Sequence, residues 1–319
     1  MSKKTKPAVL VAAPLPPFLA KPLSAAFECH DYFHATDKAA LLRDCGAHVR
    51  AIVMSGGMVL EEALLDALPF LEIISVFGVG YDGVPMKYCQ RRSIRVTNTP
   101  DVLTEDVADT ALALVLMTSR KLVEANKFLH SGYWMQGAFP LGKALGGKRA
   151  GIFGLGRIGK AIAQRLVACG MEIGYHGRAS QQSVPFIFFP ELNSLAEWAD
   201  FLIVSCPGGA ATKHAVNEGV LRALGAQGTL INIARGSVVD EMALIHALQN
   251  GTVKCAGLDV FEHEPHVPAE LLAMGNVVLL PHIGSGTHET RLAMAELVLR
   301  NLAAYFSDAP LVTPVLEIR

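Results

Sequence analysis

The chain has 319 residues, of which 51% are hydrophobic, and a formal net charge of −1. This length predicts two domains of roughly 100–200 residues. The near-neutral charge argues against nucleic-acid binding. The lack of an uncharged apolar run of about 18 residues argues against a membrane span. Six cysteines without a CxxC pair indicate the reduced thiols of a cytoplasmic protein, with no disulfide framework and no metal site.

The first hundred residues alternate between short apolar runs and helical patterns. We expect strands at 8–13, 50–54, 71–77 and 94–97, with helices at 18–27, 37–44 and 60–68. Such alternation predicts a parallel sheet that is covered on both faces.

A second series of the same kind begins at Arg149. Strands are expected at 150–153, 172–176, 201–205, 229–233, 253–258 and 277–280, and helices at 158–169, 217–224 and 240–250. Six strands with right-handed crossovers would form a complete dinucleotide-binding sheet.

Two longer helical runs lie at the junctions of the two series. The first is 104–122, with Thr104 as its N-cap and acidic residues in its first turn, and the second is 288–306. We therefore expect an α/β protein with two doubly wound parallel-sheet domains and a cleft between them. The substrate domain would be flavodoxin-like and discontinuous (1–98 plus 287–319), and the Rossmann cofactor domain would span 99–286.

A glycine-rich hexapeptide follows the first strand of the second series. Gly154-Leu155-Gly156-Arg157-Ile158-Gly159 matches G-x-G-x-x-G and opens a helix. The first glycine permits a tight turn, the second lets the backbone approach a pyrophosphate, and the third lets helix and strand pack closely. The helix N-terminus supplies N–H donors for phosphate oxygens. Glycine turns also serve plain packing, but the strand and helix around this one favour a dinucleotide site.

The turn after the next strand indicates which nicotinamide cofactor binds. An acidic residue usually binds the ribose 2′-OH of NAD at this place, but here the turn contains His176-Gly177-Arg178-Ala179-Ser180. A guanidinium can form paired bonds to a phosphate, and the Ser180 hydroxyl can add another. The turn therefore predicts NADPH in preference to NADH, with a simple surface role for Arg178 as the alternative.

Three charged or titratable residues follow the ends of expected strands: Arg235, Glu264 and His282. Chemistry gathers beyond the carboxyl ends of strands in doubly wound sheets. Together these groups suit reduction of a 2-keto acid: histidine donates a proton to the carbonyl oxygen, a carboxylate stabilises the imidazolium, and a guanidinium binds the substrate carboxylate. On spacing alone, Glu262 is an alternative to Glu264.

Four segments in chain order resemble the D-isomer-specific 2-hydroxyacid dehydrogenases: 154–159, 233–240, 259–265 and 281–286. Residues 96–109 and 139–142 are similar to the NADPH-preferring glyoxylate/hydroxypyruvate reductases of that family. The resemblance implies reduction of glyoxylate or hydroxypyruvate to the D-2-hydroxy acid, with His282 as general acid, and it selects Glu264 over Glu262. Reductases of 2-ketogluconate or aryl-pyruvates, and a non-enzymatic nucleotide-sensing corepressor, are the alternatives.

The same resemblance assigns further site residues. Substrate-binding positions would be Met54, Ser55, Val79 and Gly80, beside Arg235 and His282. Asp259 is expected to bond the nicotinamide carboxamide. The other cofactor contacts that carry over are Thr104, residues Leu155–Ile158, Cys206, Pro207, Thr212, Ile233, Ala234 and Gly284.

The resemblance also implies a homodimer, because members of this family join through their cofactor domains. The dimerisation arm would be residues 128–148. Trp134 matches a position from which the arm reaches the partner's active site, with burial at the interface alone as the alternative. The turn at His176 departs from the commoner Asn-x-Arg or Ser-x-Arg forms, which leaves the phosphate partners open.

Overall fold

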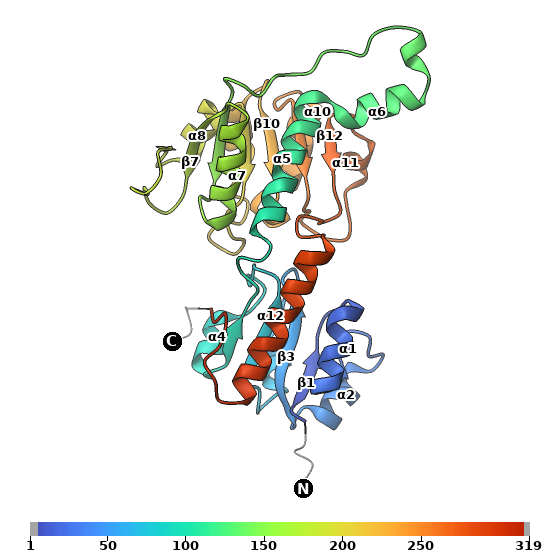
Figure 1. Cartoon of the computed structure of the whole chain (residues 1–319), viewed down its shortest axis with the longest axis vertical. Coiled ribbons are helices and arrows are strands. Elements are labelled where there is room, and N and C mark those ends of the chain that lie inside the picture. Colours follow the sequence, from blue (N-terminus) through green and yellow to red (C-terminus); the bar gives the residue numbers. More distant parts are fainter. Residues whose placement is uncertain (1–5, 316–319) are drawn as a thin grey trace. The chain divides into compact units, whose positions relative to one another are not determined.

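The computed structural model describes residues 6–315 and shows an α/β chain with two parallel sheets (Figure 1), which confirms the predicted fold class. Contacts divide the chain into two compact units: one contains the chain up to Leu103 and from Thr287 onward, and the other is Thr104–Gly286. The division falls after Leu103, whereas the sequence placed a boundary after residue 98. Hydrogen bonds from Thr99 N–H to the Gly78 carbonyl and from Thr290 Oγ1 to the Val102 carbonyl keep the intervening residues in the first unit.

The first unit contains a five-stranded parallel sheet in the order β2-β1-β3-β4-β5, which is the flavodoxin-like order. Its strands are β1 (Ala8–Val11), β2 (Glu28–Asp31), β3 (Val49–Ser55), β4 (Ile73–Phe77) and β5 (Arg95–Thr97). Strand β2 was not predicted, because it is a polar edge strand with the sequence Glu-Cys-His-Asp and lacks an apolar pattern.

The helices of the first unit cover this sheet. They are α1 (Pro17–Ala26), α2 (Lys38–Cys45), α3 (Glu62–Asp66), α4 (Met86–Arg91) and the long C-terminal α12 (His288–Phe306), which packs on β4 and α1. The core between helices and sheet is built from apolar side chains of β1, β3 and β4, including Leu10, Ile52 and Ile74. Because α12 supplies one layer, the unit needs residues from both ends of the chain.

The second unit contains a seven-stranded parallel sheet in the order β12-β11-β10-β9-β6-β7-β8. The six predicted strands are present, and β8 adds a short seventh at the edge. The strands are β6 (Arg149–Phe153), β7 (Glu172–His176), β8 (Ile187–Phe188), β9 (Phe201–Val204), β10 (Thr229–Asn232), β11 (Cys255–Leu258) and β12 (Val277–Leu279). The strand order reverses between β6 and β9, the place where doubly wound sheets bind ligands.

Helices of the second unit are α5 (Thr104–Arg120), α6 (Leu122–His130), α7 (Arg157–Ala168), α8 (Leu192–Trp198), α9 (Glu218–Leu224), α10 (Glu241–Gln249) and α11 (Ala269–Ala273). Helix α5 starts at Thr104 itself, so Thr104 is the first helical residue and not the predicted N-cap. The Arg165 guanidinium on α7 pairs with Asp109 at 2.7 Å and with Glu105 at 2.9 Å on α5. These ion pairs add to the packing of α7, which begins at the glycine loop, against α5.

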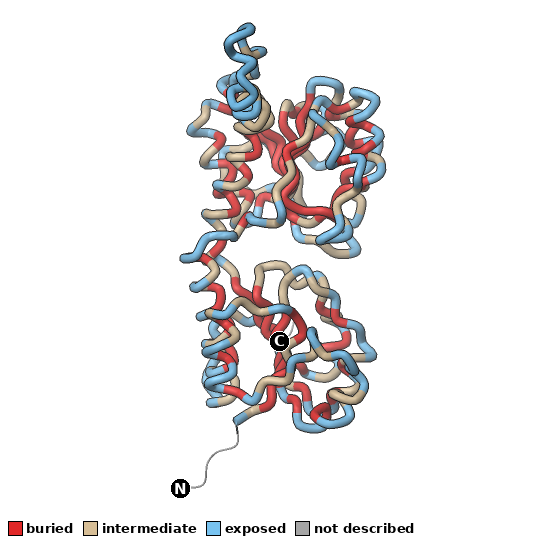
Figure 2. The backbone as a smooth tube through the Cα atoms, turned by 90° about the vertical axis from the view of Figure 1, so that its right-hand side faces the viewer, coloured by how far each residue is buried: buried red, intermediate tan, exposed pale blue. Residues whose placement is uncertain are grey.

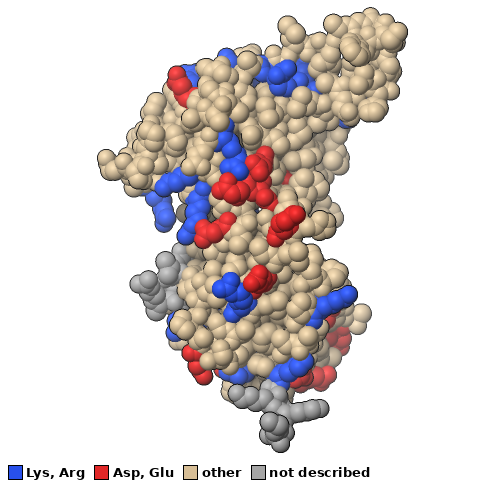
Figure 3. Space-filling model, viewed as in Figure 1, with Lys and Arg blue, Asp and Glu red and all other residues tan. Residues whose placement is uncertain are grey.

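Within residues 122–148, the part up to Leu141 forms an arm that extends away from the sheet of the second unit (Figure 1), and the chain returns to that unit at Lys143, whose N–H donates to the Ser119 carbonyl at 2.8 Å. The arm contains α6 and a short 3-10 helix, η1 (Tyr133–Met135); α6 was not predicted. Figure 2 shows the arm as largely exposed, and Figure 3 shows most of it without charged side chains. Trp134 is 68% exposed, and Met135 and Leu141 are more than 90% exposed.

No helix within residues 6–315 combines the length and the apolar character that crossing a bilayer demands.

Candidate active site

The glycine loop connects β6 to α7 at the switch point of the second sheet. Gly154 has a φ of +100°, and a Cβ there would lie 2.5 Å from the backbone N of Cys206 in the loop after β9. A Cβ on Gly159 would lie 2.2 Å from the Gly154 carbonyl oxygen. Only glycine fits at these two positions, which bring the loop, the helix and the neighbouring β9 loop into close contact.

The middle glycine of the loop faces open space. Gly156 is the N-cap of α7 and has no atom within 4 Å of the position a Cβ would take. Because glycine has no side chain, no side chain of the N-cap residue caps the first turn of α7. The N–H groups of such a turn are the ones that bind anions in folds of this kind. The backbone at Gly156 can thus be approached closely by a pyrophosphate, and the residues present fit a dinucleotide cofactor.

The turn after β7 presents a basic side chain to solvent. Arg178 and Ser180 are both exposed. The neighbouring His176 is only partly exposed, and its Nδ1 lies 2.9 Å from the Phe189 carbonyl oxygen. A carbonyl only accepts, so Nδ1 is the donor and is not available to a phosphate. Gly177 has open space around its Cα.

Gln181, which sequence reasoning missed, ties this turn to the glycine loop. Its Nε2 donates to the Leu155 carbonyl oxygen at 2.8 Å, and its backbone N–H donates to the Tyr175 hydroxyl at 2.6 Å. Only the folded arrangement of β6 and β7 brings Gln181 to Leu155, so no local pattern could have revealed it.

The loop after β9 holds three of the expected cofactor contacts. Cys206 is buried beneath Gly154, and burial raises the pKa of its thiol to about 12, so the thiol stays protonated. Pro207 is exposed, and Thr212 is partly exposed with its Oγ1 donating to the Pro207 carbonyl at 2.7 Å. Ile233 and Ala234, after β10, are buried.

Asp259 shapes the loop that carries His282. The carboxylate is 1% exposed; Oδ1 accepts the N–H of Ile283 at 2.7 Å and Oδ2 accepts that of Gly284 at 2.8 Å. Its carbonyl oxygen accepts the N–H of His282 at 2.8 Å. Burial raises the pKa of the Asp259 carboxyl although both N–H bonds lower it. Both carboxylate oxygens of Asp259 thus have a structural role, and the expected hydrogen bond to the nicotinamide carboxamide would be formed in addition to it.

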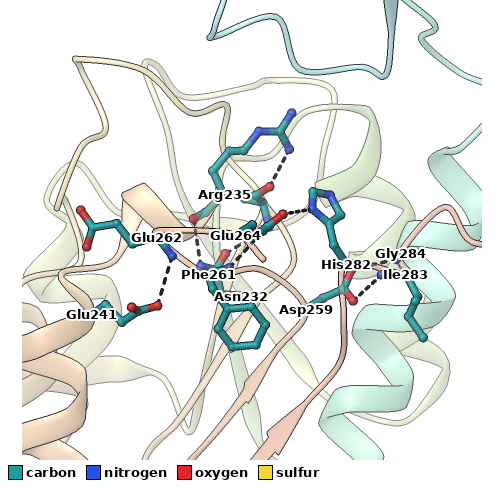
Figure 4. A network of polar contacts seen from close by, with 11 residues as sticks. Asn232, Arg235, Glu241, Asp259, Phe261, Glu262, Glu264, His282, Ile283 and Gly284 are labelled. Carbon is teal, nitrogen blue, oxygen red and sulfur yellow. Dashed lines mark hydrogen bonds and ion pairs between the residues drawn. The ribbon is translucent and has the colours of Figure 1, made fainter. Parts of the chain in front are cut away.

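His282 and Glu264 form a hydrogen-bonded pair (Figure 4). His282 Nδ1 lies 2.6 Å from Glu264 Oε2, while Glu264 Oε1 accepts the N–H of Phe261 at 3.1 Å. His282 has a φ of +53°, a conformation that is uncommon for residues other than glycine and recurs at functional sites. The three N–H bonds to Asp259 hold it there and direct the ring toward Glu264.

Arg235 lies beside this pair. It follows β10 and precedes the 3-10 helix η2 (Gly236–Val238), and its Nη1 donates to the Ala234 carbonyl at 2.8 Å. A Cβ on Gly236 would lie 1.9 Å from the Phe261 carbonyl carbon, so a glycine is required where this turn meets the Glu264 loop. In Figure 4 the side chains of Arg235 and His282 extend in the same direction from the loops that follow β10 and β12, the two strands on either side of β11.

The structure also separates the two candidate carboxylates. Glu264 contacts His282, whereas Glu262 Oε1 lies 2.8 Å from Nε2 of His214 in the β9 loop. The spacing could not distinguish them, because the direction of each side chain depends on the loop conformation.

The predicted substrate residues of the first unit differ in accessibility. The Met54 side chain is 1% exposed and packs in the core between sheet and helices of the first unit, and its assignment to substrate binding stays a prediction. Ser55, Val79 and Gly80 are partly exposed. Asn98 Nδ2 donates to the Val79 carbonyl at 2.8 Å and steadies that loop.

The Glu264 carboxyl predicts a pH dependence of stability. Burial raises its pKa, but the hydrogen bond and charge of His282, the Phe261 N–H and the Arg235 charge outweigh burial, so the pKa lies below its ordinary value of 4.5. A lowered folded-state pKa stabilises the protein above the unfolded pKa, and this contribution is lost as pH falls through the folded value. We expect Glu264→Gln to be less stable than the parent at neutral pH, and the difference to shrink below pH 4.5.

Denaturant unfolding of both proteins across this pH range measures the difference. A gap that stays constant or widens as the pH falls would contradict the assignment.

Comparison with known proteins identifies the family of the chain. Residues 112–284 match the profile described as D-isomer specific 2-hydroxyacid dehydrogenase, NAD binding domain. The chain belongs to this family. It is an NAD(P)-dependent 2-hydroxyacid dehydrogenase, and the resemblance stated from its motifs is confirmed.

Relatives cover the enzyme almost end to end. Glyoxylate/hydroxypyruvate reductase A HPR2 of Arabidopsis thaliana is 47% identical over 96% of this chain and 98% of its own length. Hydroxyphenylpyruvate reductase of Plectranthus scutellarioides is 45% identical over the same shares. The solved structure of an NADPH-dependent glyoxylate/hydroxypyruvate reductase from Sinorhizobium meliloti, in complex with NADP and malonate, superposes with a TM-score of 0.91 at 48% identity and covers 98% of both chains.

Proposed function

We propose that this enzyme reduces glyoxylate or hydroxypyruvate to the D-2-hydroxy acid with NADPH. The observation that carries the proposal is the His282–Glu264 pair beside Arg235. These residues follow strands β10 to β12 of the sheet that also bears the glycine loop. The reductase activity printed for the Arabidopsis and Sinorhizobium relatives supports the same reaction.

The side chains have separate tasks. His282 donates a proton to the carbonyl oxygen from Nε2, since Nδ1 is bonded to Glu264. The Glu264 carboxylate stabilises the protonated ring and fixes its orientation. The Arg235 guanidinium binds the substrate carboxylate and polarises the carbonyl. When bound, the reduced nicotinamide supplies the hydride.

The backbone at Gly156 and the N-terminus of α7 would hold the pyrophosphate of the cofactor. Arg178 and Ser180 would hold the 2′-phosphate, since both are exposed in the turn after β7 and no acidic residue stands there. The NADP in the Sinorhizobium relative supports this preference.

Arg178→Ala should raise the KM for NADPH about 10- to 100-fold, the usual value of a lost charged hydrogen bond to phosphate. The KM for NADH should stay within about twofold, because NADH has no phosphate for Arg178 to bind. Initial rates with each coenzyme measure both values. Arg222→Ala removes an exposed arginine of the same unit and is the control; equal losses with both coenzymes would refute the phosphate role.

The arm supports a homodimer in which the apolar residues Leu129, Tyr133, Trp134, Met135 and Leu141 are covered. We expect a dimer in analytical ultracentrifugation, and a shift toward monomer when Met135→Asp and Leu141→Asp are combined. The control is Leu272→Asp, which changes a 64% exposed side chain on α11 and should leave the dimer intact.

The role of Trp134 is tested in the intact dimer. If Trp134 reaches the partner's site, Trp134→Ala raises the KM for the keto acid. An unchanged KM would favour an interface role alone.

A substrate panel tests the reaction itself. The panel contains glyoxylate, hydroxypyruvate, 2-ketogluconate and 4-hydroxyphenylpyruvate, each with NADPH and with NADH, and follows the nicotinamide absorbance. We expect the highest kcat/KM for the two small acids with NADPH. A preference for either larger acid would replace the proposed substrate, and no turnover with any acid would favour a nucleotide-sensing role.

A further inference from the structure

A second histidine–carboxylate pair uses the same loop as Glu264 and takes no part in the proposed chemistry. His214, after β9, has its Nε2 2.8 Å from Oε1 of Glu262. Glu262 belongs to the loop after β11 that also carries Glu264 (Figure 4). The pair therefore joins the loop that holds the expected cofactor contact Thr212 to the loop that orients the general acid.

The turn after β10 contacts both the loop after β9 and the loop after β11. The N–H of His214 donates to the Ser237 carbonyl at 2.8 Å, and Gly236 packs against Phe261 so closely that a Cβ would overlap the Phe261 backbone. Three consecutive loops after β9, β10 and β11 are thus in direct contact. Each of them carries one of the proposed site residues: Thr212, Arg235 and Glu264.

Glu262 is the less accessible partner of the pair, because the His214 side chain is 37% exposed. The Glu262 side chain is 19% exposed, and its N–H donates to Oε1 of Glu241 at 3.1 Å. Glu241 is buried at the start of α10, and burial and the Glu262 charge raise its pKa. His214 has a φ of +51°, a strained backbone that persists only where surrounding contacts hold it. These contacts hold Glu262 against the start of α10 and hold the His214 backbone in its unusual conformation.

We propose that His214 and Glu262 form a positioning pair that holds Arg235 and Glu264 in register with the cofactor loop. The proposal deepens the proposed reductase function, on which it rests. The pair does not touch the reacting atoms; it acts through the three loops that it joins. Loss of either partner lets the β9 and β11 loops move independently, which displaces the Glu264 carboxylate from the His282 ring.

A double-mutant cycle tests the pair in the full-length enzyme. His214→Leu and Glu262→Met remove it, and His214→Gln keeps a donor near the Nε2 position. We expect each removal to lower kcat about 10-fold with saturating NADPH, and the double variant to lose no more than either single one. His214→Gln should stay within about threefold of the parent.

Hydrogen exchange gives a readout that does not depend on turnover. Peptides covering 207–216 and 259–266 should exchange faster in His214→Leu and in Glu262→Met, and at the parental rate in His214→Gln. The control His34→Leu removes a His34–Asp31 pair that also measures 2.8 Å but lies in the first unit. It should change neither kcat nor exchange in these peptides.

Three results would each overturn the positioning pair. The first is a loss of kcat in the double variant that equals the product of the two single losses. The others are a failure of His214→Gln to retain kcat, and unchanged hydrogen exchange at 259–266. A parent enzyme that reduces none of the keto acids overturns the proposed function instead. In that case exchange at 207–216 and 259–266 still decides the pair.

Discussion

His282→Gln should lower kcat for keto acid reduction about 10³- to 10⁴-fold, the upper range for a lost general acid. The glutamine side chain fills a similar space and can still bond Glu264, but it cannot deliver a proton to the carbonyl oxygen. The glycine loop and the turn at Arg178 are untouched by this change. The dissociation constant for NADPH should therefore stay within about twofold of the parental value.

Steady-state rates and a fluorescence titration with NADPH separate these two effects. His266→Gln, which changes an exposed histidine of the β11 loop, is the matched control and should retain the parental kcat. Turnover within tenfold of the parent in His282→Gln would remove His282 from the acid role, whatever its contact with Glu264.

Arg235→Gln should lower kcat/KM for the keto acid about 10²- to 10³-fold, as loss of a charged donor at a reacting carbonyl does. Part of the loss should be in KM, because the substrate carboxylate loses its cation, and part in kcat, because the carbonyl is less polarised. Arg235→Lys should recover only part of it, because an ammonium retains the charge but not the paired guanidinium geometry.

Inhibition by malonate gives an independent measure of anion binding. We expect its inhibition constant against the keto acid to rise in Arg235→Gln in proportion to KM, while the KM for NADPH stays near the parental value. If Arg235→Gln weakened NADPH and left malonate inhibition unchanged, Arg235 would belong to the cofactor site and not to the substrate site.

Many elements of both units were predictable from local pattern. β7 and α12 have the expected bounds, and the other predicted strands and helices differ from the observed ones at their ends. Apolar runs of four or five residues between helical patterns leave few alternatives to buried parallel strands. β2, β8 and α6 escaped prediction because edge strands and an exposed arm helix are not shaped by a core, and their sequences lack the corresponding period. The helices α4, α8 and α11 were also not predicted, because with 6, 7 and 5 residues they are too short to show a helical period.

The candidate site was also predicted in part from the sequence and decided in part by the structure. Residue order placed Arg235, Glu264 and His282 after successive strands, and parallel topology requires such strand ends to share one edge of the sheet. Which carboxylate meets His282 and which meets His214 was not determined by that order, because Glu262 and Glu264 are two residues apart in one irregular loop.

The sequence alone therefore determined the buried strands, the long helices, the glycine loop and the side chains available for chemistry, since these depend on local periodicity and residue type. Only the tertiary structure decided that Met54 is buried, that Asp259 binds three successive N–H groups and that Gln181 reaches Leu155. Those outcomes depend on contacts between segments distant in the chain, and such contacts form only when the sheet has brought its loops together.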